Sequence, residues 1–422
     1  MFLKNPFFAK EITMEAVYYS AQFIITIYYF YFFIISLFGF YRKYSDDILP
    51  PASRFAIVVA AHNEEKVIGE LIRNLYDLEY PKELYDVYVV ADNCSDSTAK
   101  IAAEKGAAVI ERFNQVDMGK GYALEYTFDK IFAQDINYDA VCVFDADNLV
   151  AENFLSIMNG HLLKGEKIIQ GYLDTKNADD TWITKAIYIS YILTNRFWQL
   201  SKYNLGLTCA LGGTGMCLSV EMLKKYGWGM TSLTEDLEFQ TKALMNNIKV
   251  CWAHDAKVYD EKPLSLMQSW RQRKRWMQGH TNVAGRYAGK LFLEGIRTKN
   301  FAMIDGAMYL IQPFLLMFTG LGMIGNIFMY DQVYDKPLMA GVSFFSQFIY
   351  FGIGLILEKV NIKAFWWLFF YPIFALTWIP VAFIGFVMRK NKVWSHTLHI
   401  RNIKHENLHL YMPSKVENRR IS

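Results

Sequence analysis

The chain has 422 residues and a formal net charge of +3, and charged residues make up only 20% of it, below the roughly 25% that is usual in soluble domains. This length exceeds one small domain, and a net charge so close to zero, without a recognition module, argues against nucleic-acid binding. The apolar excess lies mainly at the two ends, which indicates membrane segments that flank a soluble part.

The first predicted element is a membrane-spanning helix over residues 16–40. This run contains no charged side chain, and about 20 apolar residues suffice to cross a bilayer. A cleavable signal peptide is the competing interpretation, but the run is too long for the apolar core of such a peptide and no small-residue cleavage site follows. Arg42 and Lys43 come directly after the run, which favours a cytosolic end there, whereas Lys4 and Lys10 weaken that assignment.

Between the apolar ends the sequence predicts a soluble α/β region. Short apolar runs rich in β-branched residues recur within 54–61, 85–92, 107–113 and 138–145, and stretches with helical spacing separate them. Strands that alternate with helices form mainly parallel sheets with right-handed connections. Ligands bind such sheets at the carboxyl ends of the strands, and every strand named here except 107–113 ends in a polar cluster.

Two carboxylates, Asp145 and Asp147, stand one residue apart at the end of the apolar strand "VCVFDADN". If the strand persisted that far, alternation would point both to one face. Neighbouring acids repel unless a cation neutralises them, and hard ions such as Mg²⁺ take carboxylate oxygens and share substrate phosphates. A polar turn, which Asn148 favours, is the alternative, but the buried strand before the pair favours a metal site.

Other polar residues near strand ends are candidates for contacts with a nucleotide. Asp92 could accept hydrogen bonds from a base or a ribose, although the residues after it also suit a turn and a helix cap. Glu64 could touch a nucleotide or cap a helix. Lys120 stands between two glycines before a predicted helix, where close backbone approach is allowed and a lysine could meet phosphate, although the spacing is not that of a P-loop.

The stretch "TSLTEDLEFQ" places Glu235 and Asp236 at a predicted helix start. Thr234 suits a helix cap, and acids are favourable in a first helical turn, whereas the functional interpretation is a general base held at this position. Upstream, "ALGGTGMC" holds three glycines within four positions, Gly213 among them. A loop with so few side chains lets a substrate pass close to the backbone.

The stretch "SWRQRKRWMQGH" carries four cations and two tryptophans within its first eight residues. A helix places Gln272, Arg275 and Trp276 on one face, where an arginine fork suits phosphate and an indole suits a sugar ring. On the other faces, anionic lipid could meet the three remaining cations, Arg271, Arg273 and Lys274.

Three apolar runs follow, at 301–330, 338–357 and 364–388. Asp305 lies near the start of the first run, so we expect that helix to begin after it. The basic segment after the last run should face the cytosol, yet three crossings from a cytosolic domain would leave it outside. One run is therefore interfacial, re-entrant or crosses twice, and Pro372 and Pro380 make the last run the best candidate for a break.

Five motifs thus stand in order between the apolar ends: HNEE at 62–65, DNCSDST at 92–98, DAD at 145–147, TED at 234–236 and QRKRW at 272–276. In this combination the chain resembles the membrane-embedded family 2 glycosyltransferases, which include cellulose, chitin, hyaluronan and poly-N-acetylglucosamine synthases. The resemblance covers about residues 55–300, and VWSHT at 393–397 is similar to a further short motif. Many members have proline where this chain has Ala60 or Ala61.

The resemblance implies a GT-A fold, a Rossmann-like α/β domain with a mainly parallel sheet, combined with transmembrane and interfacial helices. It implies inverting transfer from a UDP-sugar with Mg²⁺ or Mn²⁺ as the cofactor. By position, Asp236 would be the general base beside Glu235, and Asp147 would bind the metal. Together with Lys120 and Gly213 of the glycine-rich stretches, the expected substrate-binding residues are Glu64, Asp92, Asp145, Gln272, Arg275 and Trp276. One base and one direct displacement suffice, so no second nucleophile is needed.

The expected layout is an N-terminal transmembrane helix, a cytosolic GT-A domain, interfacial helices with QxxRW, C-terminal transmembrane helices and a basic cytosolic tail, over residues 1–44, 45–262, 263–300, 301–388 and 389–422. This layout describes a multi-pass protein of the plasma membrane, and five scattered cysteines without CxxC spacing agree with a reducing compartment. The expected partners are a nucleotide-sugar donor, a polysaccharide or lipid acceptor and the lipid bilayer, without nucleic acid. A homo-oligomer or an accessory export subunit is compatible with this layout.

The expected function is transfer of a sugar, from UDP-glucose or UDP-N-acetylglucosamine, to a growing β-linked polysaccharide, processively and with export through the protein's own helices. Non-processive transfer to a polyprenyl phosphate or another lipid is the alternative, and the QxxRW residues count against it. A transporter or receptor with a nucleotide-binding domain is the third interpretation. The apolar runs hold few ionisable groups, and such groups usually mark ion pathways, so this interpretation is the weakest.

Overall fold

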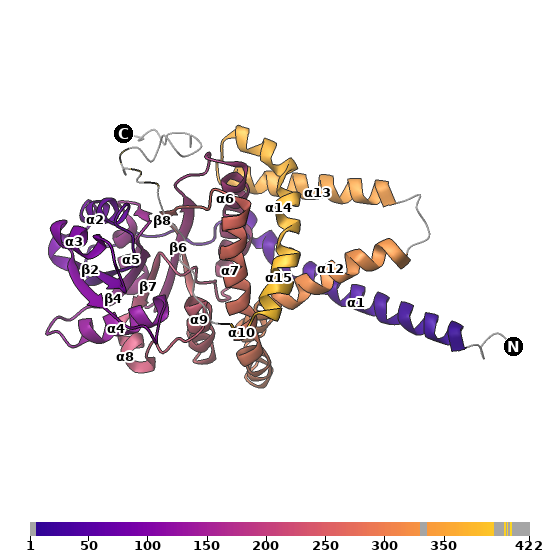
Figure 1. The fold of residues 1–422 in the computed structure, drawn as a ribbon, viewed down its shortest axis with the longest axis horizontal. Coiled ribbons are helices and arrows are strands. Elements are labelled where there is room, and N and C mark those ends of the chain that lie inside the picture. The colour runs from indigo at the N-terminus through magenta and orange to yellow at the C-terminus, as the bar shows by residue number, and fades with distance from the viewer. Residues whose placement is uncertain (1–5, 330–335, 392–400, 402, 404–405, 407–422) are drawn as a thin grey trace.

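The computed structural model describes residues 6–329 and 336–391, together with 401, 403 and 406. An α/β body forms one end of the molecule, and apolar helices project from the other end, as Figure 1 shows. The middle of the molecule is a layer of helices that includes α6 and α10, and this layer joins the two ends.

Within the described residues, eight strands form one sheet in the order β3-β2-β1-β4-β7-β6-β8-β5. Neighbouring pairs are parallel from β3 to β4, and β8 is parallel to β6, whereas β7 and β5 run the other way. Six strands therefore point in one direction and end at one edge. The strands are β1 (Phe55–Ala61), β2 (Tyr85–Asp92), β3 (Ala108–Arg112), β4 (Ala140–Asp145), β5 (Leu149–Val150), β6 (Ile168–Thr175), β7 (Met216–Ser219) and β8 (Cys251–Asp260).

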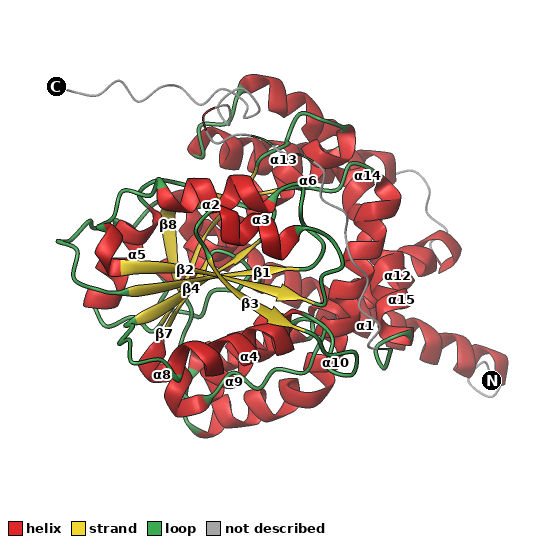
Figure 2. Ribbon diagram, turned by 60° about the vertical axis from the view of Figure 1, so that its left-hand side comes forward, coloured by secondary structure: helices red, strands yellow, loops and turns green. Residues whose placement is uncertain are grey.

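Helices cover both faces of the sheet, as Figure 2 shows for α2 and α3 on one side and α4, α8 and α9 on the other. The helices of the α/β body are α2 (Ile68–Tyr76), α3 (Thr98–Glu104), α4 (Lys120–Phe132), α5 (Phe154–Leu163), α6 (Trp182–Thr194), α7 (Ser201–Asn204), α8 (Val220–Tyr226) and α9 (Glu235–Met245). Short 3₁₀ segments span Phe38–Phe40, Lys82–Leu84 and Ile362–Phe369, and a π-helical segment spans Asn195–Leu200.

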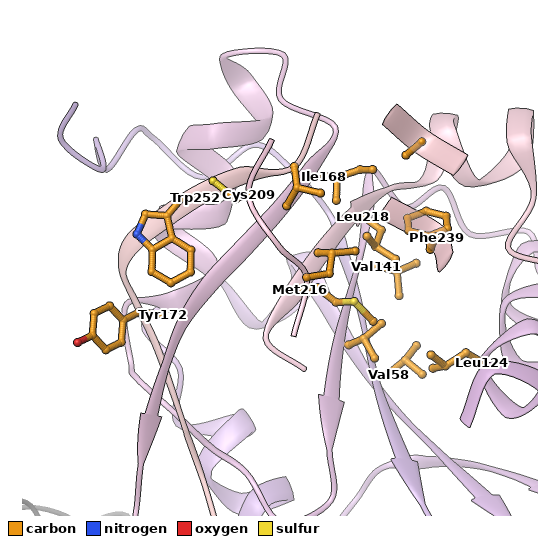
Figure 3. Close-up of a cluster of buried hydrophobic side chains, with 14 of the residues drawn as sticks. Val58, Leu124, Val141, Ile168, Tyr172, Cys209, Met216, Leu218, Phe239 and Trp252 are labelled. Carbon is orange, nitrogen blue, oxygen red and sulfur yellow. The ribbon is translucent and has the colours of Figure 1, made fainter. Parts of the chain in front are cut away.

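The core is divided between the two faces by the period of two along each strand. In β1, Val58 packs into the cluster under α4 and α9, which Figure 3 shows, whereas Ile57 and Val59 pack under α2. All three side chains are fully buried. Strands buried on both faces read as continuous apolar runs, which is why β1, β2 and β4 were predictable from the sequence.

The remaining helices are α1 (Pro6–Leu37), α10 (Leu266–Arg297), α11 (Phe301–Leu310), α12 (Gln312–Met329), α13 (Lys336–Leu357), α14 (Tyr371–Leu376) and α15 (Trp378–Val387). Among the described residues, one segment, 18–40, is long and apolar enough to cross a membrane. Two broken pairs qualify if each counts as one span: α11 with the first part of α12, bent by 51°, and the 3₁₀ segment at 362–369 with α14 and α15, bent by 52°. The expected break in the last run is present, and the first run is broken as well.

Asp305 corrects the expectation that the first C-terminal helix begins after it. Helix α11 begins at Phe301 and includes Asp305, which is fully buried. Its carboxylate lies 2.8 Å from the ammonium of Lys202, and the Tyr31 hydroxyl donates to it at 3.0 Å. The acid is tolerated inside the helix because a buried cation and a hydrogen bond satisfy it.

Arg273 corrects a second expectation, that this cation faces lipid. Its side chain is 1% exposed and packs between α10 and the last two helices. The guanidinium carbon lies 4.6 Å from the ring centre of Phe374 and 4.9 Å from that of Trp378, and Nη1 donates to Thr377 Oγ1 at 2.8 Å. Sequence spacing could not show this because the partners lie about 100 residues further along the chain.

Two described residues of the C-terminal tail contact the α/β body. The Arg401 side chain donates to Asp180 at 2.9 Å, and Ile403 is buried against Leu149 and Tyr259. Most of the predicted tail 389–422, including VWSHT at 393–397, lies outside the described residues.

Candidate active site

Two of the predicted site residues, Asp92 and Asp145, lie at the edge of the sheet where the six parallel strands end. Asp92 closes β2, Asp145 closes β4 and Asp260 closes β8, while Arg112 is the last residue of β3. Carboxyl ends of parallel strands are the usual ligand position in sheets of this kind. This edge therefore brings three acidic side chains and one cation together from segments that are far apart in the sequence.

A pocket of about 430 Å³, including its open mouth, lies beside the ends of β1 and β2. The Asp92 carboxylate forms part of its wall and receives a hydrogen bond from Arg112 Nη1 at 2.6 Å. Burial raises the pKa of Asp92, while Arg112 opposes that shift. The lining residues are Ala60, Ala61, His62, Asp92, Asn93, Met118, Gly119, Lys120 and Ala123.

Arg112 is a site residue that the sequence reasoning missed. It lies opposite Asp92 in the parallel register of β2 and β3 and is only 7% exposed. The strand at 107–113 was the one without a recognised polar end, because a single arginine in "VIERF" does not form a cluster. The available signal was a cation one residue before the end of that apolar run.

Glu64 is buried at 6% exposure, but it is not among the residues that line the pocket. Its backbone N–H donates to Thr98 Oγ1 at 2.8 Å, and its carbonyl accepts the N–H groups of Val67 and Ile68 just before α2. The HNEE stretch thus ties the end of β1 to the starts of α2 and α3. A contact between Glu64 and a nucleoside stays a prediction.

Lys120 connects the pocket to the acids of β4. It is the first residue of α4, after Gly119, whose φ of 117° is a backbone conformation that favours glycine. Its ammonium contacts the Asp145 carboxylate and donates to the carbonyl of Gly213 at 2.7 Å. The glycine-rich loop and the DAD motif, predicted as separate candidates, are therefore joined by one cation.

Glu235 and Asp236 begin α9 beside this cation. The position that a Cβ would take on Gly213 is 3.4 Å from Asp236 Oδ2, so the glycine loop lies against this carboxylate. Burial, followed by the neighbouring Glu235, raises the pKa of Asp236 to about 7. Burial also raises the pKa of Glu235, although Lys120 and Arg275 oppose that shift. Asp236 is thus a carboxylate poised to accept a proton near neutral pH.

Helix α10 packs directly on the start of α9. A Cβ on Gly279 would lie 2.6 Å from the Thr234 side chain, so only glycine permits this approach. Thr234 precedes the helix, but its side chain makes no capping hydrogen bond and its Oγ1 has no hydrogen-bond partner. The predicted cap is therefore wrong, and Thr234 serves as the packing surface for α10.

The three QxxRW residues lie half-buried on α10, with Arg275 and Trp276 one turn and Gln272 two turns before Gly279. Arg275 is close enough to act electrostatically on Glu235. The indole of Trp276 lies nearly parallel to that of Trp378, with 6.4 Å between ring centres. The structure brings Arg275 to the acids of α9, while a contact of Gln272 or Trp276 with a sugar stays a prediction.

The DAD motif does not form two strand positions that point the same way. Strand β4 ends at Asp145, and Asp147 lies in the following turn, buried at 5% exposure. One Asp147 oxygen accepts the N–H of Glu261 at 2.8 Å, and Lys176 donates to its carbonyl at 2.7 Å. The expectation of strand alternation is wrong at Asp147 because the turn takes over directly after Asp145.

The residues at the DAD turn fit a hard divalent cation by the chemistry of their donors. Asp145 and Asp147 offer only oxygen ligands, and Mg²⁺ commonly binds through one or two carboxylates while it keeps water and substrate phosphates. Among the described residues, no group of three or more His, Cys, Asp or Glu side chains could hold a metal ion by itself. A site at this turn would therefore need oxygens from the substrate to complete it.

The ends of β6 and β8 add residues that the sequence reasoning did not find. Lys262 lies 2.6 Å from Asp260 and 3.2 Å from the ring centre of Tyr191, and Lys176 lies 3.5 Å from Glu261. Burial, opposed by Lys262, raises the pKa of Asp260 to about 6. These side chains lack an apolar run or a motif around them, so nothing in the local sequence marked them.

Comparison with known proteins agrees with this architecture. The profile described as "Glycosyltransferase like family 2" matches residues 50–279, more than half of the chain. The probable glycosyltransferase YdaM of Bacillus subtilis is 27% identical over 297 residues, which cover 68% of this chain and 69% of that protein. The β-monoglucosyldiacylglycerol synthase of Trichormus variabilis is 31% identical over 248 residues, 57% of this chain, and the match spans about half, 51%, of that synthase.

A third relative and one solved structure extend further along the chain. The poly-β-1,6-N-acetyl-D-glucosamine synthase of Staphylococcus epidermidis is 23% identical over 354 residues, 77% of this chain and 80% of that synthase. A mannosyltransferase from Pyrobaculum calidifontis, solved with GDP-Man and Mn²⁺, has a TM-score of 0.57 at 15% identity and covers 90% of this chain and 97% of its own. The chain therefore belongs to glycosyltransferase-like family 2 and is a glycosyltransferase with a GT-A-like α/β fold.

Proposed function

We propose that the protein transfers a hexose from a UDP-sugar to the hydroxyl of a growing β-linked polysaccharide, with inversion at the anomeric carbon. The observation that carries this proposal is the position of Asp236. Burial and Glu235 raise the pKa of this carboxylate to about 7. It lies near Lys120, which also lines the pocket, and at the point where α9 meets α10.

The donor lies along a line from the pocket to Asp236. The nucleoside occupies the pocket, where Asp92 accepts hydrogen bonds and Arg112 holds that carboxylate in place. The diphosphate then reaches Lys120, with Arg275 near Glu235 on the other side. Cations at this position stabilise the charge that develops on the leaving diphosphate. Asp145 and Asp147 would hold Mg²⁺ or Mn²⁺, which supplies further charge neutralisation to the diphosphate.

The chain's own residues account for the chemical step. Asp236 takes the proton of the acceptor hydroxyl, and the hydroxyl oxygen forms the new bond to the anomeric carbon. The bond between that carbon and the diphosphate oxygen breaks, so that the diphosphate leaves with the electron pair. Burial, together with the neighbouring Glu235, keeps the pKa of Asp236 high enough for proton transfer at neutral pH.

The layout of α10 and one relative support a polymer as the acceptor. Helix α10 contacts α9 on the active-site side and packs against α11 and α15 on the membrane side, so an acceptor that leaves Asp236 meets the membrane helices. Of the relatives described above, the poly-N-acetylglucosamine synthase matches over the largest share of the chain. On this proposal Gln272 and Trp276 line the acceptor path, and the α/β body faces the cytosol of a multi-pass plasma-membrane protein.

A lipid acceptor is the second candidate, and a separate observation favours it. The synthases of β-monoglucosyldiacylglycerol are up to 31% identical to this chain. Exposed apolar side chains of α10, Leu293 and Ile296 among them, would place the site near a bilayer surface. A lipid could therefore reach Asp236 from the membrane without a polymer channel.

The two candidates differ in the size and solubility of the product. The purified full-length protein, in detergent with Mn²⁺, is given radiolabelled UDP-glucose and UDP-N-acetylglucosamine in separate reactions, with Asp236→Asn as the blank. A long polymer that glycosidases degrade supports the proposal. A single sugar on an organic-soluble lipid replaces it with the second candidate. Failure of a folded protein to transfer from either donor, with or without added lipid acceptors, contradicts both.

A further inference from the structure

The ammonium of Lys120 lies among three carboxylates rather than in open solvent. It contacts Asp145 directly and donates to the carbonyl of Gly213, the residue whose absent side chain leaves room beside Asp236. Burial alone would lower the pKa of Lys120, but Asp145, Glu235 and Asp236 together raise it above its ordinary value. The lysine therefore stays charged, and it balances acids that would otherwise repel one another.

Lys120 also differs from the other lysines of this edge in its access to the donor. Lys176 and Lys262 are sealed, with side chains 3% exposed, and each pairs with a carboxylate away from the pocket. The Lys120 side chain is 17% exposed and forms part of the pocket wall with Asp92. Lys120 is thus the lysine of this edge that both contacts the acid at the end of β4 and reaches the pocket.

We propose that Lys120 is a resident counter-ion, which holds Asp145 in the nucleotide-free enzyme and passes to the diphosphate when the donor and the divalent metal ion enter together. This inference rests on the proposed function, since it assumes that a nucleoside diphosphate binds here. A metal ion alone must compete with the ammonium for Asp145. A diphosphate removes that competition because it offers Lys120 a new anionic partner, and it also supplies oxygens that the metal needs.

If Lys120 passes from Asp145 to the diphosphate, the binding of UDP and the binding of Mn²⁺ are thermodynamically coupled. If UDP strengthens the binding of Mn²⁺ by some factor, Mn²⁺ strengthens the binding of UDP by the same factor. Lys120 is one source of this coupling, because it weakens the binding of Mn²⁺ when no nucleotide is bound. Removal of its charge should therefore improve the binding of Mn²⁺ alone, which is the opposite of what the loss of an ordinary binding residue does.

The test is a titration of Mn²⁺ into the purified full-length protein, followed by electron paramagnetic resonance of the free ion, with and without UDP. We expect Lys120→Met to bind Mn²⁺ alone about tenfold more tightly than the wild type and to bind it less tightly than the wild type when UDP is present. Lys167→Met removes an exposed lysine that pairs with Glu221 far from the pocket, and it should match the wild type in both titrations.

A mirror variant keeps the proposal testable if Lys120→Met does not fold. Asp145→Asn frees Lys120 from its partner, so the binding of UDP without metal, measured by calorimetry, should become at least about fivefold tighter. The exchange is wrong if a folded Lys120→Met binds Mn²⁺ alone no better than the wild type, or if Asp145→Asn leaves UDP binding unchanged or weaker. A wild type that binds no UDP even with Mn²⁺ overturns the proposed function itself.

Discussion

The two halves of the sheet, β3-β2-β1-β4 and β7-β6-β8-β5, differ in the sequence patterns of their strands. In the first half, β1, β2 and β4 are apolar runs buried on both faces, and helices alternate with them. In the second half, β6 carries buried polar residues at its end, β7 is a short antiparallel strand and β8 alternates between buried and half-buried positions. Apolar patterning therefore locates the first half, while the second half adds specific polar contacts to its apolar core.

The two halves differ in how much buried polar contacts contribute to their stability. The first half is held by apolar burial, which is non-directional and tolerates variation. The second half is also apolar in its core, since Ile168 and Trp252 pack in the same cluster as Val58. It adds buried hydrogen bonds and ion pairs, such as those of Gln170 and Lys176, and leaving one partner of such a contact unpaired is costly. Single polar substitutions should therefore do more damage in the second half, except where the first half also buries an ion pair.

The largest expected effect concerns the buried ion pair of the first half, between Arg112 and Asp92. Arg112→Leu leaves the Asp92 carboxylate buried without its partner, and breaking such a pair costs about 3–5 kcal/mol. The melting temperature should fall, and UDP binding should weaken because Asp92 loses its fixed position. The double variant with Asp92→Asn removes the orphaned charge, so most of the stability should return. If the single and double variants melt alike, the ion pair does not hold the pocket.

An effect of comparable size is expected at Gln170, in the second half. Its amide donates to the carbonyl of Thr214 and accepts the N–H of Gly212, both at 2.9 Å, and the side chain is fully buried. Gln170→Leu has a similar size but leaves these loop groups unsatisfied, at about 1–3 kcal/mol each. Thermal melting should show the loss. An unchanged melting temperature would contradict the claim that polar contacts help to hold this half.

Helix α10 offers a comparison between two glycines on one element. Gly279→Ala places a methyl group 2.6 Å from Thr234 and should move α10 away from α9, at a cost of about 1–3 kcal/mol. The transfer rate should fall with it, because Arg275 shifts relative to Glu235. Gly285→Ala is the matched control, since nothing lies within 4 Å of its added methyl group, and it should be neutral or stabilising. Equal effects of the two substitutions would count against the close packing of α10 on Thr234.

The smallest expected effect is on the pH dependence of the rate. Asp236 must be ionised to accept a proton, and its pKa is raised to about 7. The transfer rate should therefore fall as the pH drops below about 7 and level off above it. The observed midpoint belongs to Asp236 and Glu235 together, because the two carboxylates interact. A rate that stays constant between pH 8 and pH 5 would exclude Asp236 as the base.

The sequence predicted the parts of the site that follow local rules. The sequence singled out the acids at and directly after the end of β4, the lysine that begins α4 and the acids that begin α9, because each marks a boundary between apolar stretches. Arg112 was missed because it is a single cation whose partner, Asp92, closes another strand. Lys262 pairs with the acid two residues before it, and was missed because no motif or apolar run marked that segment. The position of Arg273 and of Asp305 could not be predicted, because burial by distant segments decides whether a charge faces lipid or a partner.

The central claim is that Asp236 is the base of sugar transfer, and one pair of measurements on Asp236→Asn tests it most directly. With the donor and acceptor established for the wild type, the variant should transfer sugar about 10²–10⁴-fold more slowly. It should bind UDP in the presence of Mn²⁺ as the wild type does, because Asp92 and Lys120 are unchanged. A variant that transfers at the wild-type rate would contradict the account. A folded variant that has lost UDP binding would contradict it equally, since Asp236 would then serve the donor site and not the proton transfer.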